Sequence, residues 1–257
     1  MSILSATDLE FSYGAQPVLR GVGFDGLKSG QVTALIGPNA AGKSTLFRLI
    51  SGLTKPRSGT ITLGDIDLDT LPMRERLKRI CFMPQYFAAN AALTVFDVVM
   101  MAHKQLKGWR VSEEDIRTVS LTLHSAGIGH LAEAYVSELS GGQSQMVSAA
   151  QALIRRSDVY LFDEPTSALD LRHQLEVLGR IKRAMADRDA IGLVALHDLN
   201  LAARFADHLI LLGKGRILAQ GTPETVLRSA AISETYGVDV AISTGPRKDL
   251  IVHAYAS

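Results

Sequence analysis

One stretch near residue 40 has the residue types and the spacing to bind phosphate. Its residues are Gly37, Pro38, Asn39, Ala40, Ala41, Gly42, Lys43, Ser44 and Thr45. They fit the pattern G-x-x-x-x-G-K-[ST], in which successive backbone N–H groups and a helix N-terminus converge on an anion. Lys43 would add a cation for the outer phosphates, and the Ser44 hydroxyl could bind Mg²⁺. We therefore expect a phosphate-binding loop at residues 37–45, called the P-loop below.

The residues on both sides of the P-loop predict the elements that have to position it. Val32–Ile36 is an apolar run typical of a buried strand, and residues 46–50 carry apolar side chains at helical spacing. Strand, loop and helix are the context that this motif requires. The alternative is a glycine-rich turn that binds nothing, and the motifs described next argue against it.

Two adjacent carboxylates could complete the chemistry. Asp163 and Glu164 directly follow the apolar residues 159–162, which we expect to form another buried strand. A carboxylate at a strand end can hold Mg²⁺, while its neighbour can orient and polarise an attacking water. Acidic turns are common, but the position after a P-loop and at the end of an apolar strand favours the catalytic interpretation.

A third segment also has the features of an anion site. Leu139, Ser140, Gly141, Gly142 and Gln143 precede a long helical pattern at residues 144–154. Ser140 would cap that helix, and the two glycines would leave its N-terminal amides open to a close anion. Residues 139–143 are called the signature segment below.

The N-terminal part of the chain reads as short strands separated by turns. Residues 2–35 include a predicted hairpin whose second arm begins near Val18. Tyr13 stands before a glycine on this hairpin, where it could stack on a nucleotide base or simply cover the hairpin's edge. The spacing leaves both alternatives open. Further strands are predicted at residues 60–63 and 77–82, the second leading to Gln85.

The middle of the chain is predicted to be helical. Thr94 is a plausible N-cap for one helix, and Ser112 begins another with an acidic first turn that runs to about residue 125. An insert of this kind suggests a separate subdomain. The predicted division assigns 1–87 and 156–257 to the β subdomain and core, and 88–155 to the helical insert.

Composition excludes several other classes of protein. A net charge of +1 over 257 residues gives no reason to expect nucleic acid as a partner. The single cysteine, Cys81, rules out an intrachain disulfide and suits a reducing compartment. The N-terminal residues lack the features of a signal peptide, and the apolar runs are too short to span a bilayer. We therefore expect a soluble chain.

Together, the order and spacing of these motifs resemble the ATP-binding subunits of ABC transporters along nearly the whole chain. The matching positions are Walker A at 37–45, the Q-loop glutamine Gln85, the signature at 139–143, Walker B at 159–163, Glu164, the D-loop at 167–170 and the switch histidine His197. The resemblance implies an α/β fold, namely a P-loop NTPase (RecA-like) core with an N-terminal antiparallel β subdomain and an inserted α-helical subdomain.

The family likeness also implies ATP and Mg²⁺ as ligands. It makes Tyr13 the aromatic residue that stacks on adenine, and it assigns catalysis to Glu164, His197 and Lys43. The implied Mg²⁺ ligands are Ser44, Gln85 and Asp163. Two subunits would form a head-to-tail homodimer, with each ATP held between one P-loop and the partner's signature segment and Asp170. The γ-phosphate would then join the two halves until hydrolysis removes it.

Residues after His197 narrow the resemblance further. Residues 197–207, 221–227 and 236–240 are similar to the importer subgroup that handles ferric siderophores, haem and cobalamin. This implies membrane permease subunits, a periplasmic substrate-binding protein and a peripheral location on the cytoplasmic face of the inner membrane. Siderophore import fits best, with haem or cobalamin as alternatives. A soluble ABC ATPase unconnected with transport is the rival class, although such proteins carry long coiled-coil inserts or two cassettes.

A permease would be expected to dock in a groove between the helical insert and the core, near Gln85. Val95, Phe96, Val98 and Val99 could line that groove, or they could instead fill the insert's own core.

The sequence also departs from the family pattern at four positions. Ala40 replaces a common glycine and fits only if its φ stays negative. Ser144, Met146 and Gln151 stand where arginines are common, which could weaken interface electrostatics or retune the helix's contacts.

Overall fold

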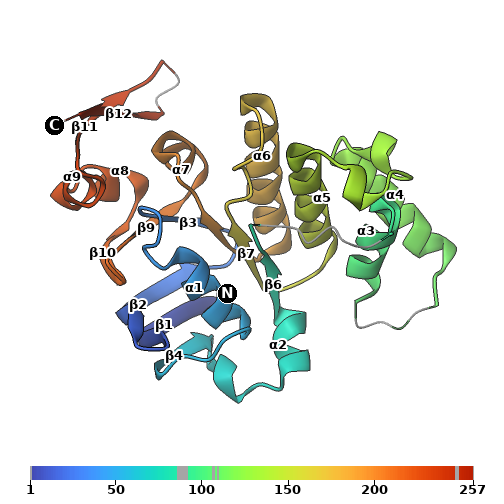
Figure 1. Cartoon of the computed structure of the whole chain (residues 1–257), viewed down its shortest axis with the longest axis horizontal. Coiled ribbons are helices and arrows are strands. Elements are labelled where there is room, and N and C mark those ends of the chain that lie inside the picture. Colours follow the sequence, from blue (N-terminus) through green and yellow to red (C-terminus); the bar gives the residue numbers. More distant parts are fainter. Residues whose placement is uncertain (1, 86–91, 106–107, 109, 247–248, 257) are drawn as a thin grey trace.

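A six-stranded sheet lies at the centre of the molecule (Figure 1), in the order β10-β9-β3-β8-β7-β6. The structure is a computed structural model that describes residues 2–85, 92–105, 108, 110–246 and 249–256. The strands are β3 (Val32–Ile36), β6 (Ile80–Met83), β7 (Val159–Asp163), β8 (Ile191–Ala195), β9 (His208–Gly213) and β10 (Arg216–Gly221). All neighbours pair in parallel except β10, which runs antiparallel to β9. The segments that follow β3, β6, β7 and β8 therefore leave the sheet at the same edge.

A second sheet of four strands is built from the N-terminal part of the chain. Its order is β2-β1-β4-β5, and its pairs are antiparallel. The strands are β1 (Ile3–Tyr13), β2 (Gln16–Lys28), β4 (Ser58–Leu63) and β5 (Ile66–Asp67). β1 and β2 form the predicted hairpin, although its second arm begins at Gln16. A separate hairpin, β11 (Val238–Thr244) and β12 (Leu250–Ala256), lies near the C-terminus.

Helices cover both faces of the central sheet. The α-helices are α1 (Lys43–Ser51), α2 (Met73–Arg79), α3 (Val95–Lys104), α4 (Glu113–Ser125), α5 (Gly141–Ile154), α6 (Leu171–Arg188), α7 (Leu199–Phe205), α8 (Pro223–Leu227) and α9 (Ala230–Tyr236). Single turns of 3₁₀ helix occur at Leu68–Thr70, Gly129–Leu131 and Val136–Glu138. In Figure 1, α3 and α4 lie on the far side of α5 from the central sheet. None of the described helices is both long and apolar enough to cross a membrane.

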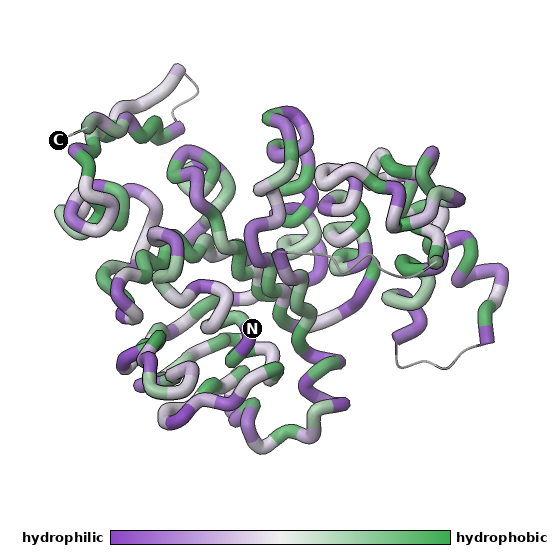
Figure 2. The backbone as a smooth tube through the Cα atoms, viewed as in Figure 1, coloured by the Kyte–Doolittle hydropathy of each residue, from purple (hydrophilic) through white to green (hydrophobic). Residues whose placement is uncertain are grey.

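The central strands are buried on both sides, which is why they read as continuous apolar runs. On β7, Val159 and Leu161 pack with α1 and the antiparallel sheet, whereas Tyr160 and Phe162 pack with α5 and α6. All five residues of β7 are buried. Figure 2 shows the corresponding hydrophobic residues along the centre of the molecule. The sheet edge that carries the predicted site is thereby held by two separate cores.

Helix caps set the starts of α3, α4 and α5 at the residues that the sequence predicts. Thr94, Ser112 and Ser140 each accept a bond from the backbone N–H three residues later, and each of those later residues returns a side-chain bond. The helices α3, α4 and α5 pack on one another. Val95, Val98 and Val99 are at most 6% exposed, so of the two alternatives they take the second and fill the insert's own core, while Phe96 is only partly buried.

The predicted strand at residues 77–82 is wrong in its first half. Residues 77–79 end α2, and β6 begins only at Ile80. The cause is Arg76, which is 5% exposed and donates to the carbonyls of Leu49 and Ile50 at the end of α1. This buried guanidinium satisfies carbonyls that a helix end leaves without partners, and it holds residues 73–79 in a helix.

Candidate nucleotide site

The P-loop connects β3 to α1 in a conformation that needs its glycines. Gly37 has φ +146, and a Cβ there would lie 2.0 Å from the Leu212 carbonyl oxygen. Gly42 has φ +107, and a Cβ there would lie 2.7 Å from the Leu19 side chain. Both spaces are closed by neighbouring strands, so the loop backbone can follow this path only without side chains at these two positions.

Lys43 lies along the inside of the P-loop. Its Nζ donates to the carbonyl oxygens of Gly37 at 2.8 Å and Pro38 at 3.1 Å. Burial lowers the pKa of Lys43, while the charges of Glu164 and Asp163 nearby oppose that shift. The ammonium group therefore stands between the loop and the two carboxylates, where an anion in the loop would meet it.

Ala40 corrects one expectation from the sequence. Its φ is +62, in the left-handed region, whereas alanine was predicted to fit only at negative φ. Ala41 N donates to the Pro38 carbonyl at 3.3 Å and closes a tight turn around it. The loop therefore tolerates a strain of about 1–2 kcal/mol, which glycine would avoid.

Three side chains from adjacent strand ends converge on one another. Gln85 follows β6, Glu164 follows β7 and His197 follows β8. Gln85 Nε2 donates to Glu164 Oε2 at 2.6 Å, and His197 Nε2 pairs with Glu164 Oε1. Both carboxylate oxygens of Glu164 are thus occupied. Its φ of +52 is uncommon for a residue with a side chain and is typical of functional sites.

Asp163 ends β7 beside the P-loop and is 3% exposed. Burial raises its pKa, and the adjacent Ser44 and Lys43 offset part of that rise. Within the described part of the chain, its Oδ1 has no hydrogen-bond partner. A buried carboxylate oxygen without a partner is costly unless a cation or donor approaches it. Asp163 and Ser44 therefore form a pair of oxygen ligands suited to a hard cation.

The signature segment lies against the D-loop of its own chain. A Cβ on Gly142 would be 3.1 Å from the Ala168 carbonyl, and one on Gly141 would be 3.6 Å from the Ala168 Cβ. A cavity of about 530 Å³ opens beside these glycines, lined in part by His130, Asp170 and His173. Among the described residues, no hydrogen bond or ion pair joins this segment to the P-loop. Within the described residues, the two predicted anion sites are therefore not linked directly in one chain.

Tyr13 lies at the tip of the β1–β2 hairpin. Its ring contacts Phe11 edge-on, with centroids 4.8 Å apart, and 48% of the residue remains exposed. The same hairpin reaches the P-loop, since Val18 and Leu19 lie against Gly42. An exposed ring packed on Phe11 is compatible with both alternatives, stacking on a base and simple cover of the hairpin.

The similarity of this chain to known proteins establishes its family. The family described as "ABC transporter" matches residues 19–167. The chain belongs to this family. The hemin import ATP-binding protein of Thermobifida fusca is 38% identical over 95% of this chain and 86% of its own length. The iron(3+)-hydroxamate import ATP-binding protein of Bacillus subtilis is 33% identical over 96% of this chain and 92% of its own.

Solved structures of ABC transporters agree with the observed fold. A transporter assigned to the metal-chelate type, in an inward-facing conformation, superposes with a TM-score of 0.82 over 99% of this chain and 97% of its own, at 26% identity. This confirms the predicted fold class of a P-loop NTPase with mixed α/β sheets. As a member of the ABC family, the chain is an ATP-binding ATPase subunit.

Two of the three positions where this ABC subunit lacks arginine contribute to internal packing. Met146 is 9% exposed and joins the core between α5 and α6. Gln151 Nε2 donates to the Val98 carbonyl at 3.1 Å, which ties α5 to α3. Both side chains therefore contribute to packing within the subunit, and the effect of replacing arginine stays a prediction.

Sequence reasoning missed one polar residue at this site. Gln145 lies within the helical pattern after the signature segment, yet it is buried and contacts the residues just after β7. A polar residue on the apolar face of a predicted helix was the available signal. Its partners are set by tertiary packing and could not be identified from spacing.

Proposed function

We propose that this chain is the ATP-hydrolysing subunit of an importer that takes up a ferric siderophore or a similar iron chelate across the bacterial inner membrane. The observation that carries the proposal is the convergence of Gln85, Glu164 and His197 beside Lys43 and Asp163. The names of two relatives, which refer to import of hemin and of iron(3+)-hydroxamate, support the cargo class. Haem and cobalamin remain the alternatives.

Binding of ATP uses the backbone of the P-loop. The N–H groups of residues 39–45 and the N-terminus of α1 would cradle the phosphates. Lys43 Nζ, which bonds two loop carbonyls here, would turn to the outer phosphate oxygens. Tyr13 would stack on adenine at the open end of the hairpin.

The residues present fit a bound Mg²⁺ ion. Ser44 and Asp163 supply oxygen ligands, including the buried Asp163 Oδ1, and Gln85 would complete the set. When bound, Mg²⁺ would neutralise charge on the phosphates of ATP. This accounts for a carboxylate that is otherwise buried without a partner in the described part of the chain.

Hydrolysis is assigned to Glu164, which would accept a proton from the attacking water. Gln85 and His197 each contact one carboxylate oxygen, and each oxygen keeps a further lone pair for the water. His197 would bond the γ-phosphate on release from Glu164. The two contacts would thus orient the carboxylate toward the water.

Two copies of this chain would form each complete site. The signature segment presents the N-terminal amides of α5, capped by Ser140, and in the described part of the chain no hydrogen bond joins it to its own P-loop. A head-to-tail homodimer would place Leu139, Ser140, Gly141, Gly142, Gln143 and Asp170 against the partner's ATP. ATP would then hold the two subunits together until hydrolysis.

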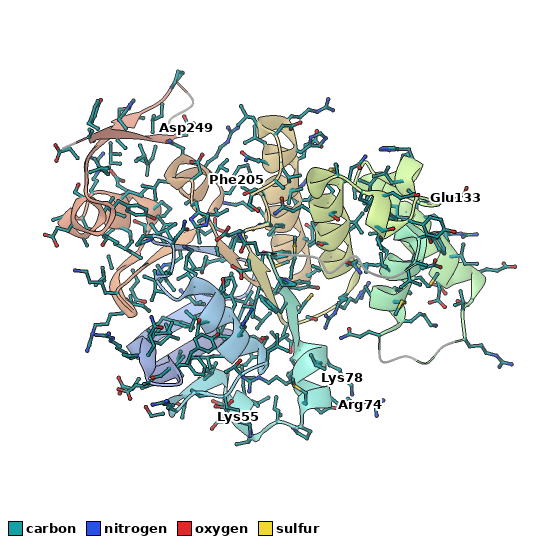
Figure 3. All side chains as sticks on the ribbon, in the orientation of Figure 1. Lys55, Arg74, Lys78, Glu133, Phe205 and Asp249 are labelled. Carbon is teal, nitrogen blue, oxygen red and sulfur yellow. The ribbon has the colours of Figure 1, made fainter. Side chains whose placement is uncertain are left out.

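The permease is proposed to dock on a basic cavity between the core and the insert, which lies at the opposite end of β6 from Gln85 and so differs from the groove near Gln85 expected from the sequence. This cavity of about 630 Å³ lies where the ends of α2, α3 and α5 approach α4. It is lined by Lys78, Ala102, His103, Lys104, Gln105, Glu114, Thr118, Ile154, Arg155 and Arg156. Lys78, labelled in Figure 3, lies in the last turn of α2. Its cationic lining fits a cytoplasmic permease helix that carries acidic residues.

Uptake measurements in a strain lacking this gene would test the proposal. The strain should lose growth on one ferric siderophore as sole iron source, and the wild-type gene should restore growth whereas Glu164→Gln should not. Loss of growth on haem alone, or loss of cobalamin uptake, would instead select one of the alternatives. Unchanged uptake of all three, with the purified chain still hydrolysing ATP, would favour a soluble ABC ATPase.

A further inference from the structure

Gln145 connects α5 to the backbone of Glu164. The residue is 5% exposed, and its Nε2 donates to the Glu164 carbonyl oxygen at 2.6 Å and to Ser167 Oγ at 3.1 Å. Its Oε1 accepts from Ala168 N at 2.8 Å. One buried amide therefore ties α5 to Glu164, Ser167 and Ala168 in the segment between β7 and α6.

The orientation of this amide is fixed by its partners. A backbone carbonyl only accepts and a backbone N–H only donates, so exchanging the amide oxygen and nitrogen would break two of the three bonds. The site thus requires a side chain that donates at one end and accepts at the other, at the reach of glutamine. Within α5, Gln151 offers a comparison, because it bonds the Val98 carbonyl and has no hydrogen bond to the nucleotide site among the described residues.

The bond to Glu164 acts on a strained backbone. Glu164 has φ +52, and residues with side chains persist in this region only when their surroundings hold them there. Its carbonyl oxygen accepts from Gln145 Nε2 and from Ser167 N, the latter at 3.3 Å. This anchored backbone aims the carboxylate at Gln85 and His197.

The same turn supports the signature segment. Gly142 packs closely against Ala168, since a Cβ on Gly142 would lie only 3.1 Å from the Ala168 carbonyl oxygen. Gln145 follows on the next turn of α5 and bonds Ala168 N. A displacement of the α5 N-terminus is therefore passed to residues 164–168 by direct contact and hydrogen bonds.

We propose that Gln145 is a positioning residue for ATP hydrolysis, which couples the signature segment's contact with the partner's nucleotide to the placement of Glu164. The proposal rests on the function proposed above. It adds a route within one chain, from the segment that contacts one ATP to the carboxylate that acts on the other.

Steady-state hydrolysis and equilibrium ATP binding by the purified full-length chain would test this role. Gln145→Met keeps the size of the side chain but removes all three bonds, and Gln145→Glu keeps an acceptor for Ala168 N while losing the amide donor to Glu164. We expect kcat per bound ATP to fall by about 10- to 100-fold in both variants, as misplacement of a reacting group produces. The Kd for ATP should stay within about two-fold of wild type, because the P-loop is untouched.

Gln151→Met is the matched control, since it removes a glutamine-to-carbonyl bond from the same helix and should retain kcat. A kcat near wild type in Gln145→Glu, or an equal loss in Gln151→Met, would overturn the proposal. If Gln145→Met does not fold, the Gln145→Glu result decides. Absence of hydrolysis by the wild-type chain, or normal hydrolysis by Glu164→Gln, would instead refute the proposed function and this role with it.

Discussion

At the scale of single residues, the site is organised around the side chain of Glu164. Gln85 and His197 bind its two oxygens, and Gln145 binds its carbonyl. None of these partners is adjacent to it in the chain, and each follows a different strand or lies on a helix. Each carboxylate oxygen keeps a further lone pair beside its partner, so these contacts can orient Glu164 while leaving it able to accept a proton.

Glu164→Gln should lower kcat by about 100-fold or more while leaving ATP binding intact. The amide keeps the shape of the side chain but cannot accept a proton from water, and general bases of this kind contribute about 10²–10⁴-fold. Phosphate release and ATP binding measured on the same preparation would check both points. Glu133→Gln is the control, since Glu133 is exposed on the insert (Figure 3). Normal turnover by Glu164→Gln would remove Glu164 from its proposed role.

Tyr13→Ala should weaken ATP binding by about 1–3 kcal/mol, the usual contribution of a base–aromatic stack. Every base has a π-face, so the loss should be similar for ATP and GTP. Tyr13→Phe serves as the control because it keeps the ring, and its Kd should match wild type. An unchanged Kd in Tyr13→Ala would show that the ring only covers the hairpin edge beside Phe11.

At the scale of elements, the sequence predicted what depends on neighbouring residues. The caps at Thr94, Ser112 and Ser140 were predicted because a helix N-terminus is set by residues within three positions. The start of β6 and the left-handed conformation of Ala40 were not predicted. They depend on Arg76 and on the packing around the P-loop, which involve residues distant in the chain. The motif residues of the site were predicted, whereas Gln145 was not.

The junction of α3 and α4 depends on one carboxylate. Asp115 accepts from the backbone and hydroxyl of Ser112 and pairs with Lys104 and His103 at the end of α3. Hydrogen bonds from Lys104 and Ser112 hold the pKa of Asp115 well below its usual range. A carboxylate whose folded-state pKa is lowered stabilises the fold above its unfolded pKa, and that contribution is lost as pH falls.

Asp115→Asn should therefore have a lower Tm than wild type at neutral pH, and the difference should shrink below about pH 4, near the pKa of an unfolded aspartate. Thermal unfolding followed across this pH range would measure the difference. Asp25→Asn is a suitable control because Asp25 is exposed and makes no hydrogen bond among the described residues. A difference that persists unchanged at low pH would assign the effect to packing and not to charge.

At the scale of the whole molecule, the proposed function requires a second copy of the chain. We propose that the P-loop and the signature segment both bind phosphate through backbone amides, yet the first follows β3 and the second lies at the start of α5. The exposed Gly141 lies at that helix start, and a Cβ there would meet Ala168 at an ordinary contact distance of 3.6 Å. A charged side chain can therefore be placed at this position without disturbing the fold of the monomer.

This gives a direct test of the head-to-tail dimer, made in the Glu164→Gln background so that ATP persists. Size exclusion with ATP should show a dimer for Glu164→Gln and a monomer once Gly141→Glu is added, because the new carboxylate would face the partner's phosphates. The doubly substituted monomer should still bind ATP, since its own P-loop is intact. Leu121→Glu puts the same charge on an exposed position of α4 and should leave the dimer unaffected. A dimer that survives Gly141→Glu would exclude the signature segment from the ATP interface.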